Sequence, residues 1–309
     1  MLYSVFLAHA LSVVLMMIAP NVDSLQQTTK YFLYRKVLWL AWKLFRISER
    51  MPLTLIRRFL TSLAWLVLES LETLNIKFCC TPLNHIIDRL FKTRQVSVLQ
   101  IGSNVGVTYN DPVHRWVRRK SWRGVFVEPI PSIYRQLRDS YQKYVTTEGF
   151  KKLQFLNCAV SATSTTSKIS LYTPVETPET QSDAYWSRMQ LTQISSVSES
   201  QTQESLKAAN LPNQIEKIVV HCRTLSDIIS RELNDICDFL HIDTEGLDVD
   251  LLSSYFQTAP RVMPSLILFE YRHSDRSSLN DLISLMSSWE YDCQFLDEED
   301  MVCIHKEAL

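Results

Sequence analysis

The sequence predicts an α/β fold with a doubly wound, mostly parallel sheet. Four short apolar runs, at residues 97–101, 124–127, 239–242 and 265–269, have the composition of strands that are buried on both faces. Each run is followed directly by a glycine or an acid. Helical patterns lie between the runs, and this is the alternation that a parallel sheet with crossover helices requires.

The remaining elements are predicted from the same patterns in chain order. The domain begins near residue 82, and apolar residues recur at helical spacing at 83–92, 130–143, 248–256 and 278–288. A third strand in chain order is expected at 153–160. The tail alternates apolar and polar residues at 291–296 and 300–305, which predicts an antiparallel hairpin.

A glycine-rich turn follows the first strand. Gly102 and Gly106 allow the backbone to turn sharply and to approach a ligand closely. Glu128 follows the second strand, 22 residues beyond Gly106, where a carboxylate can accept hydrogen bonds from two ribose hydroxyls. A turn of this kind also occurs as a plain tight connection, so it predicts a nucleotide-type pocket only together with the other strand ends.

The polar residues at the strand ends are expected to meet at one edge of the sheet, because parallel strands place all their carboxyl ends there. Gly102 and Glu128 would then line one crevice with three acids from the later strands, Asp243, Glu245 and Glu270. Convergence of several acids is a stronger indication of a functional site than a single glycine turn.

Five segments resemble the successive motifs of the FkbM-type methyltransferases, in order and in spacing. They are LQIGSNVG at 99–106, VEP at 127–129, NCAVS at 157–161, TLSD at 224–227 and IDTEG at 242–246. The resemblance covers roughly residues 95–305. It implies a seven-stranded Rossmann-like fold of class I methyltransferases that uses S-adenosylmethionine.

The chain departs from the pattern of that family at four positions. Val105 stands where relatives often carry an aspartate, and His241 stands where many carry a lysine. Leu247 and Asp248 replace a His-Glu pair. These departures bear on turnover and on the identity of the substrate more than on cofactor binding.

The resemblance also implies which residues hold the cofactor. The glycine turn would line the methionine moiety, an acid would reach its amino group, a second acid would bind the ribose, and two apolar residues would contact the adenine. The residues of the turn are Gly102, Ser103, Asn104 and Gly106. The acid at the amino group is Asp111, the acid at the ribose is Glu128, and the apolar residues at the adenine are Ile130 and Ala159. Asp243, at the adjoining strand end, is also expected to line the cofactor site.

Methyl transfer to a hydroxyl requires in-line positioning and a group that takes the proton of the acceptor. The candidates are Asp243 and Glu245, ranked first, with Glu270 and His273. Simpler roles exist: Glu245 and Asp248 precede a helix, where an acid stabilises the helix dipole, and His273 could pair on a surface loop. Asp243, Glu245, Glu270 and His273 could instead hold a divalent cation that orients the hydroxyl.

The first 80 residues predict an extension of the α/β domain, which spans 81–309. Residues 1–22 are almost wholly apolar and are expected to be a signal anchor or a signal peptide. Residues 23–80 contain basic amphipathic helices with tryptophans, which favour contact with a membrane over packing on the enzyme domain. The basic bias places the catalytic domain on the cytosolic face.

A long segment rich in Ser, Thr and Gln, at 161–204, interrupts the α/β alternation. One interpretation is a substrate lid in which Tyr185 and Trp186 cover the crevice. The other, which we prefer, is a solvated loop with a short strand at 167–172.

Composition excludes some classes of protein and leaves three functions. A net charge of −1 argues against nucleic-acid binding, and seven cysteines without a repeated spacing predict neither a disulfide framework nor a zinc site. The leading function is a membrane-attached methyltransferase acting on a hydroxyl of a sugar, a lipid or a small metabolite. The alternatives are a nicotinamide-dependent oxidoreductase, whose third fingerprint glycine is missing, and a noncatalytic membrane adaptor that keeps the cofactor fold.

Overall fold

The structure, a computed structural model, describes most of the 309-residue chain beyond residue 81: residues 82–92, 94–106, 111–175, 194–208, 211 and 214–308. The chain divides into two compact units, 1–92 and 93–309. In the first unit, the structure describes helix α4 (Pro82–Phe91), which confirms the helix predicted at 83–92. Its Leu83, Ile87 and Phe91 are buried and lie four residues apart, on one face of the helix.

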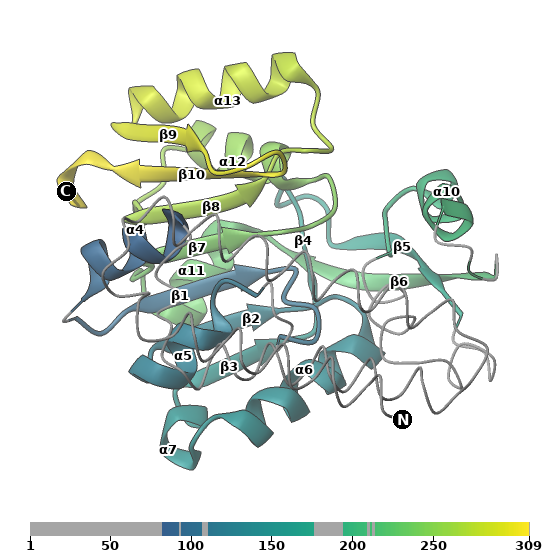
Figure 1. Cartoon of the computed structure of the whole chain (residues 1–309). Coiled ribbons are helices and arrows are strands. Elements are labelled where there is room, and N and C mark those ends of the chain that lie inside the picture. Colours follow the sequence, from purple (N-terminus) through teal and green to yellow (C-terminus); the bar gives the residue numbers. More distant parts are fainter. Residues whose placement is uncertain are drawn as a thin grey trace, which may run out of the picture. The chain divides into compact units, whose positions relative to one another are not determined.

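A seven-stranded sheet forms the core of the second unit, as the sequence predicts (Figure 1). Its strands are β1 (Ser97–Ile101), β2 (Arg123–Val127), β3 (Leu153–Leu156), β7 (Phe239–Ile242), β8 (Leu266–Glu270), β9 (Tyr291–Phe295) and β10 (Asp300–His305). Their order is β3-β2-β1-β7-β8-β10-β9. The first five are parallel, and β10 runs antiparallel to both of its neighbours. The fold is therefore doubly wound α/β with a reversed strand near the end, and the predicted hairpin is confirmed.

Helices cover both faces of this sheet: α5 (His114–Lys120), α6 (Pro131–Tyr144), α7 (Thr147–Phe150), α11 (Leu225–Leu233), α12 (Asp248–Gln257) and α13 (Arg276–Ser288). Leu99 and Ile101 of β1 share one face and pack in a core cluster with apolar residues of α11, α12 and α13. On the other face, Phe126 of β2 contacts Tyr141 of α6, with ring centroids 4.5 Å apart. Burial on both faces explains why these strands read as unbroken apolar runs.

A second sheet has the order β4-β6-β5, from β4 (Ala159–Val160), β5 (Lys168–Pro174) and β6 (Ile215–Arg223). The single strand predicted at 153–160 is therefore wrong: it divides at Asn157 into β3 and β4, which pair in different sheets. The side-chain amide of Asn157 donates to the carbonyl oxygens of Glu128 and Pro129, at 2.9 and 3.0 Å, and holds the chain where it leaves the first sheet.

The predicted insertion at 161–204 contributes ordered structure to this second sheet. The short strand expected at 167–172 is confirmed as β5, which pairs antiparallel with β6. A helix not predicted from the sequence, α10 (Glu199–Ala208), follows later in the segment. Tyr185 and Trp186, the residues of the proposed lid, lie outside the described residues.

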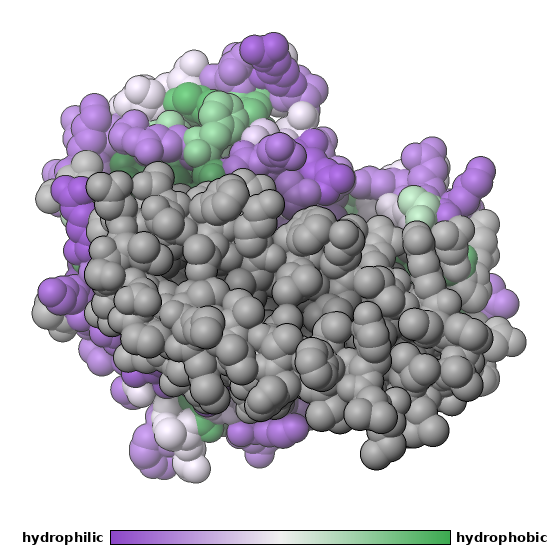
Figure 2. Space-filling model, viewed as in Figure 1, coloured by the Kyte–Doolittle hydropathy of each residue, from purple (hydrophilic) through white to green (hydrophobic). Residues whose placement is uncertain are grey.

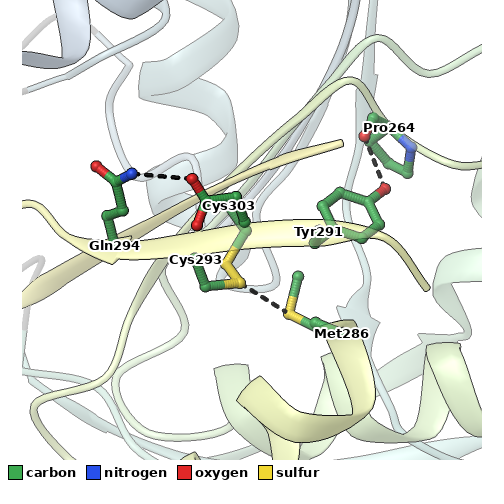
Figure 3. Close-up of a disulfide and its surroundings, with 7 residues drawn as sticks. Pro264, Met286, Tyr291, Cys293, Gln294 and Cys303 are labelled. Carbon is green, nitrogen blue, oxygen red and sulfur yellow. Dashed lines mark hydrogen bonds between the residues drawn. A yellow bond between two sulfur atoms is a disulfide. The ribbon is translucent and has the colours of Figure 1, made fainter. Parts of the chain in front are cut away.

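The β9–β10 hairpin carries a disulfide that the sequence did not predict. Cys293 and Cys303 stand directly opposite each other in the hairpin and are covalently joined (Figure 3). Beside them, the Tyr291 hydroxyl donates to the Pro264 carbonyl oxygen at 2.7 Å. Cross-strand pairing brings the two sulfurs together although ten positions separate them in the chain.

The described surface is mostly hydrophilic on the face drawn in Figure 2, with small apolar groups between the polar ones. Within the described ranges, no helix has the length and apolar character needed to cross a membrane. The signal segment predicted at 1–22 and the basic helices predicted at 23–80 lie outside the described residues.

Candidate active site

The turn after β1 is bonded to the ends of both neighbouring strands. The backbone N–H groups of Gly102 and Ser103 each donate to the Val127 carbonyl oxygen at 3.0 Å. Gly102 has φ +73°, and a Cβ placed on it would lie 1.7 Å from the Asp243 carbonyl oxygen. Only glycine fits here. The turn therefore joins the ends of β1, β2 and β7.

Ser103 and Asn104 use their side chains inside this turn. Ser103 is 2% exposed, and its hydroxyl donates to the Gln100 carbonyl oxygen at 3.0 Å and accepts from the Val127 N–H at 3.2 Å. Asn104 has φ +46°, and its Oδ1 accepts from the Val105 N–H at 2.7 Å. Both side chains build the turn, and their contacts with a methionine moiety remain predictions.

Glu128 links the turn after β1 to the start of α6. The residue is 5% exposed; its Oε2 accepts from the Asn104 N–H and its Oε1 from the Ile130 N–H, both at 3.0 Å. Burial raises the pKa of Glu128 to about 7, although the two hydrogen bonds act in the opposite direction. A carboxylate offers about four lone-pair positions, so roughly two are left for donors such as ribose hydroxyls.

Gly106 allows α6 to pack closely on the glycine turn. It has φ +71°, and a Cβ placed on it would lie 2.4 Å from Leu137 Cδ1 and 2.5 Å from the Tyr141 ring. Both of these residues are fully buried on α6. The second glycine of the motif is therefore required by helix packing, whatever ligand the turn binds.

Asp111 lies just before helix α5 and accepts hydrogen bonds from the backbone at its start. Its carboxylate accepts from the N–H groups of Val113 and His114, at 2.8 and 2.6 Å, and from Gln100 Nε2 at 3.0 Å. Burial raises the pKa of Asp111 to about 6, against the effect of these hydrogen bonds. The predicted contact of Asp111 with the cofactor amino group remains a prediction.

The two residues predicted to contact the adenine lie in one apolar cluster. Ile130, which precedes α6, and Ala159 of β4 are both buried, and they pack with Leu171 of β5 and Val220 of β6. The second sheet thus adjoins the end of β2. The structure brings Ile130 and Ala159 together beside Glu128, and their role toward an adenine remains a prediction.

Three of the four predicted catalytic residues meet at the ends of β7 and β8. His273 Nε2 lies 3.6 Å from Glu245 Oε2 and 3.8 Å from Glu270 Oε1. One side-chain atom from each of these residues lies within 4.8 Å of the other two. Asp243, the fourth, directly follows β7. Its N–H donates to the Ile101 carbonyl oxygen at 3.0 Å, and its backbone lies against the glycine turn.

Asp300 joins these acids, although sequence reasoning missed it. It is the first residue of β10 and stands opposite Glu270 in the antiparallel register. The available signal was the acidic run at 297–300 just before the last strand. Local pattern does not reveal the register of a long-range strand pair. We call Asp243, Glu245, Glu270 and Asp300 the acid cluster.

Burial raises the pKa of each member of the acid cluster, and repulsion from neighbouring acids raises it further. The pKa is about 8 for Glu270, about 7 for Glu245 and about 6 for Asp300. Solvent reaches Asp243, but the packing around its carboxyl group and four acidic neighbours raise its pKa well above 3.8. Near neutral pH the cluster therefore holds protons that it can exchange.

Positive charge near the acid cluster is sparse. Arg272 forms its ion pair with Glu299, and it only partly opposes the rise in the pKa of Glu245. Over the described ranges, His273 is the basic side chain within 4 Å of Glu245 and Glu270. Two carboxylates and an imidazole this close reach hydrogen-bond distance after small side-chain shifts, and they are also a donor set that divalent cations accept.

His241 and Leu247, two of the positions that depart from the family pattern, do not belong to this group of acids. His241 lies in β7, opposite Gln100 in register, and burial lowers its pKa to about 3, so its imidazole is neutral. Leu247 packs against the main core cluster. Both substitutions alter packing inside the domain.

A model of the "Methyltransferase FkbM domain" matches residues 100–293, more than half of the chain. No curated protein sequence matches the chain. Among solved structures, a methyltransferase FkbM from Methylobacillus flagellatus KT is similar, with 12% identity and a TM-score of 0.41, over 85% of this chain and 58% of the other. The present chain thus spans less than two thirds of that protein.

Two further methyltransferase structures are similar at lower scores. A SAH-bound methyltransferase from Podospora anserina has 10% identity and a TM-score of 0.33, over 87% of this chain and 88% of its own. A precorrin-6y C5,15-methyltransferase from Geobacter metallireducens GS-15 has 8% identity and a TM-score of 0.33, over 72% of this chain and 86% of its own.

Proposed function

Because the chain belongs to the FkbM methyltransferase family, we propose that it uses S-adenosylmethionine to methylate a hydroxyl group on a sugar, a lipid or a small metabolite. The observation that carries the proposal is the junction at Gly102. There the cofactor-type turn touches the Asp243 carbonyl oxygen, so the predicted cofactor site adjoins the acid cluster. A transferase needs these two sites side by side, because donor and acceptor must meet in line.

The residues at the first of these sites fit S-adenosylmethionine. Gly102 lets the turn pack directly against the Asp243 backbone, and Glu128 keeps lone-pair positions after accepting its two backbone hydrogen bonds. Ile130 and Ala159 supply apolar surface next to Glu128. When bound, S-adenosylmethionine would supply a methyl group on an electrophilic sulfonium.

The chain's own task is then to orient the acceptor and remove its proton. A base is most effective when its pKa lies near the working pH, and Glu245 and Glu270, with pKa values of about 7 and 8, meet that condition. His273 lies 3.6 Å from Glu245 and 3.8 Å from Glu270, so that a small side-chain shift would let it receive the proton. Asp243, nearest the turn, would orient the acceptor hydroxyl.

Membership of the family favours methyl transfer over the nicotinamide-dependent reaction, which the missing third glycine also disfavours. The noncatalytic adaptor is the remaining alternative. It would bind the cofactor without forming product, so that binding and turnover have to be measured separately.

We also propose that the N-terminal segment attaches the enzyme to a membrane, with the catalytic domain on the cytosolic face, because residues 23–80 are basic. The Cys293–Cys303 disulfide favours the opposite face, since disulfides are rare in the cytosol. Protease treatment of sealed vesicles that carry the full chain decides between them. Digestion of the catalytic domain without detergent supports the cytosolic face, and protection supports the lumenal one.

The proposed cofactor is tested by calorimetric titration of the full chain with S-adenosylmethionine, S-adenosylhomocysteine and NAD. We expect both adenosyl ligands to bind and NAD not to bind. Glu128→Ala should weaken adenosyl binding by about tenfold or more, because hydrogen bonds to a charged group are lost. Glu148→Ala, at an exposed acid of α7, is the matched control and should bind normally. A folded chain that binds neither adenosyl ligand would overturn the proposal.

A further inference from the structure

Asp248, at the start of α12, bonds the ends of two different strands. The residue is 0% exposed. Its Oδ2 accepts from the N–H and the hydroxyl of Thr244, at 3.2 and 2.6 Å, just after β7. Its Oδ1 accepts from the N–H of Glu270, at 3.3 Å, at the end of β8. One buried carboxylate therefore connects the two strand ends that carry Glu245 and Glu270.

The hydrogen bonds specify a carboxylate at this position. All three partners of Asp248 are donors, because the Thr244 hydroxyl already accepts from the Leu247 N–H at 3.2 Å and has its hydrogen left for Asp248. The N-terminus of α12 adds a favourable dipole for the buried anion. An amide or an apolar side chain would leave buried donors without acceptors.

The loop between the two strands depends on this anchor. Glu245 has φ +58° and Gly246 has φ +117°, so the loop follows a backbone path that most residues avoid. Thr244 precedes this stretch and Asp248 follows it, and their mutual hydrogen bonds close it into a small ring. Glu245 is therefore held within a closed loop.

We propose that Asp248 is the positioning residue of the acid cluster, whose buried carboxylate sets the position of Glu245 relative to Glu270. The catalytic consequence of this positioning rests on the proposed methyl transfer. The geometric part does not, because it concerns the two acids in the free protein.

The charges around the two acids define what a titration would measure. Glu245 faces Asp243, Asp248, Glu270, Arg272, Glu299 and His273. Glu270 faces Asp243, Glu245, Asp248, Asp300, Glu299 and His273. Because Glu245 is among the acids that raise the pKa of Glu270, the strength of that coupling reports how close the two side chains are.

The experiment is a carboxyl ¹³C NMR titration of the full chain labelled with [5-¹³C]glutamate, in buffer with EDTA. In the wild-type chain, Glu245→Gln should lower the titration midpoint of Glu270 by about 0.5 pH unit or more. In the Asp248→Asn chain, the same substitution should lower it by less than half as much, because the two acids are no longer held together. Asp250→Asn, at an exposed acid in the same helical turn, is the matched control and should leave the coupling unchanged.

Each other outcome overturns the inference. If Asp248 acts through its charge alone, the Glu270 midpoint falls in Asp248→Asn but its coupling to Glu245 stays the same. The same result is expected if Asp248 serves only to cap α12, because Asp248→Asn still removes a charge that raises the pKa of Glu270. Should Asp248→Asn fail to fold, Thr244→Val removes one of the three hydrogen bonds and should reduce the coupling partially. None of these NMR measurements depends on methyl transfer. A failure of the proposed function would therefore be seen separately, in the calorimetric titration.

Discussion

The candidate site has two halves, one at the ends of β1 and β2 and one at the ends of β7 and β8. They differ in how many hydrogen bonds their acids accept. At the ends of β1 and β2, both oxygens of Glu128 accept backbone N–H groups, and Ser103 and Asp111 are similarly engaged. At the ends of β7 and β8, Glu270 Oε2 is buried and has no hydrogen-bond partner within the described structure. The side chains of the first half are fixed by internal hydrogen bonds before any ligand binds. The second half keeps a carboxylate oxygen without a hydrogen-bond partner, which is available for chemistry.

The first way to test this contrast is to disturb the backbone of each half. Gly102→Ala would place a Cβ 1.7 Å from the Asp243 carbonyl oxygen, so backbone must move against backbone. We expect the free energy of unfolding to fall by on the order of 3 kcal/mol or more, measured by urea denaturation.

Gly246→Ala, in the second half, is the comparison for that variant. Its Cβ would lie 3.3 Å from His273 Cβ, which leaves φ strain as the main penalty. The loss of stability should be clearly smaller than for Gly102→Ala. Equal losses would show that the glycine turn is no more rigid than the loop after β7.

The second way is to remove one hydrogen-bond acceptor from the first half. Glu128→Gln replaces an oxygen that accepts a backbone N–H with an amide that donates, so a buried N–H loses its partner. Because the pKa of Glu128 is raised to about 7, its ionisation opposes folding at higher pH, so the comparison is made at pH 5, where the group is mostly protonated. There the free energy of unfolding should fall by about 2 kcal/mol, and adenosyl binding should weaken with it. A neutral or stabilising effect would mean that the raised pKa of Glu128 reflects an unfavourable site, as in the second half.

The third way is the corresponding change in the acid cluster, and its sign is opposite. The pKa of Glu270 is about 8 in the folded protein, above its ordinary value of 4.5, so ionisation opposes folding. The stability that this group contributes is present below about pH 4.5 and is lost as the pH rises through about 8. Glu270→Gln cannot ionise, so it should stabilise the chain by about 1 kcal/mol at pH 9 and have little effect at pH 5. Denaturation curves at both pH values check this. A loss of stability at pH 9 would contradict it.

The sequence predicted the parts of the fold that short-range pattern encodes. The apolar runs located β1, β2, β7 and β8, and the residue following each apolar run supplied Gly102, Glu128, Asp243 and Glu270. It could not predict that the chain changes sheets at Asn157, because the hydrogen bonds from that amide go to a distant turn. The Cys293–Cys303 disulfide and the place of Asp300 depend on the register of the last hairpin, which is a long-range property.

The candidate site was predicted in outline for the same reason. Glu245, Glu270 and His273 come together because strand ends share an edge. The internal hydrogen bonds of Ser103 and Asp111 were not foreseen, since their partners include backbone groups whose directions only the folded chain defines. The sequence places Asp248 at a helix start, where an acid stabilises the helix dipole, and does not reveal that it accepts from Glu270, 22 residues further along the chain.

The place of β10 between β8 and β9 affects the order in which the domain is completed during synthesis. β9 is made before β10 but, among the described strands, is hydrogen-bonded to β10 alone. Until residues 300–305 have left the ribosome, the outer edge of β8 is open, and Asp300 is not yet opposite Glu270. A nascent chain can therefore complete its glycine turn while its acid cluster is still unassembled, so the capacity to hold a cofactor would precede the capacity to take up a proton.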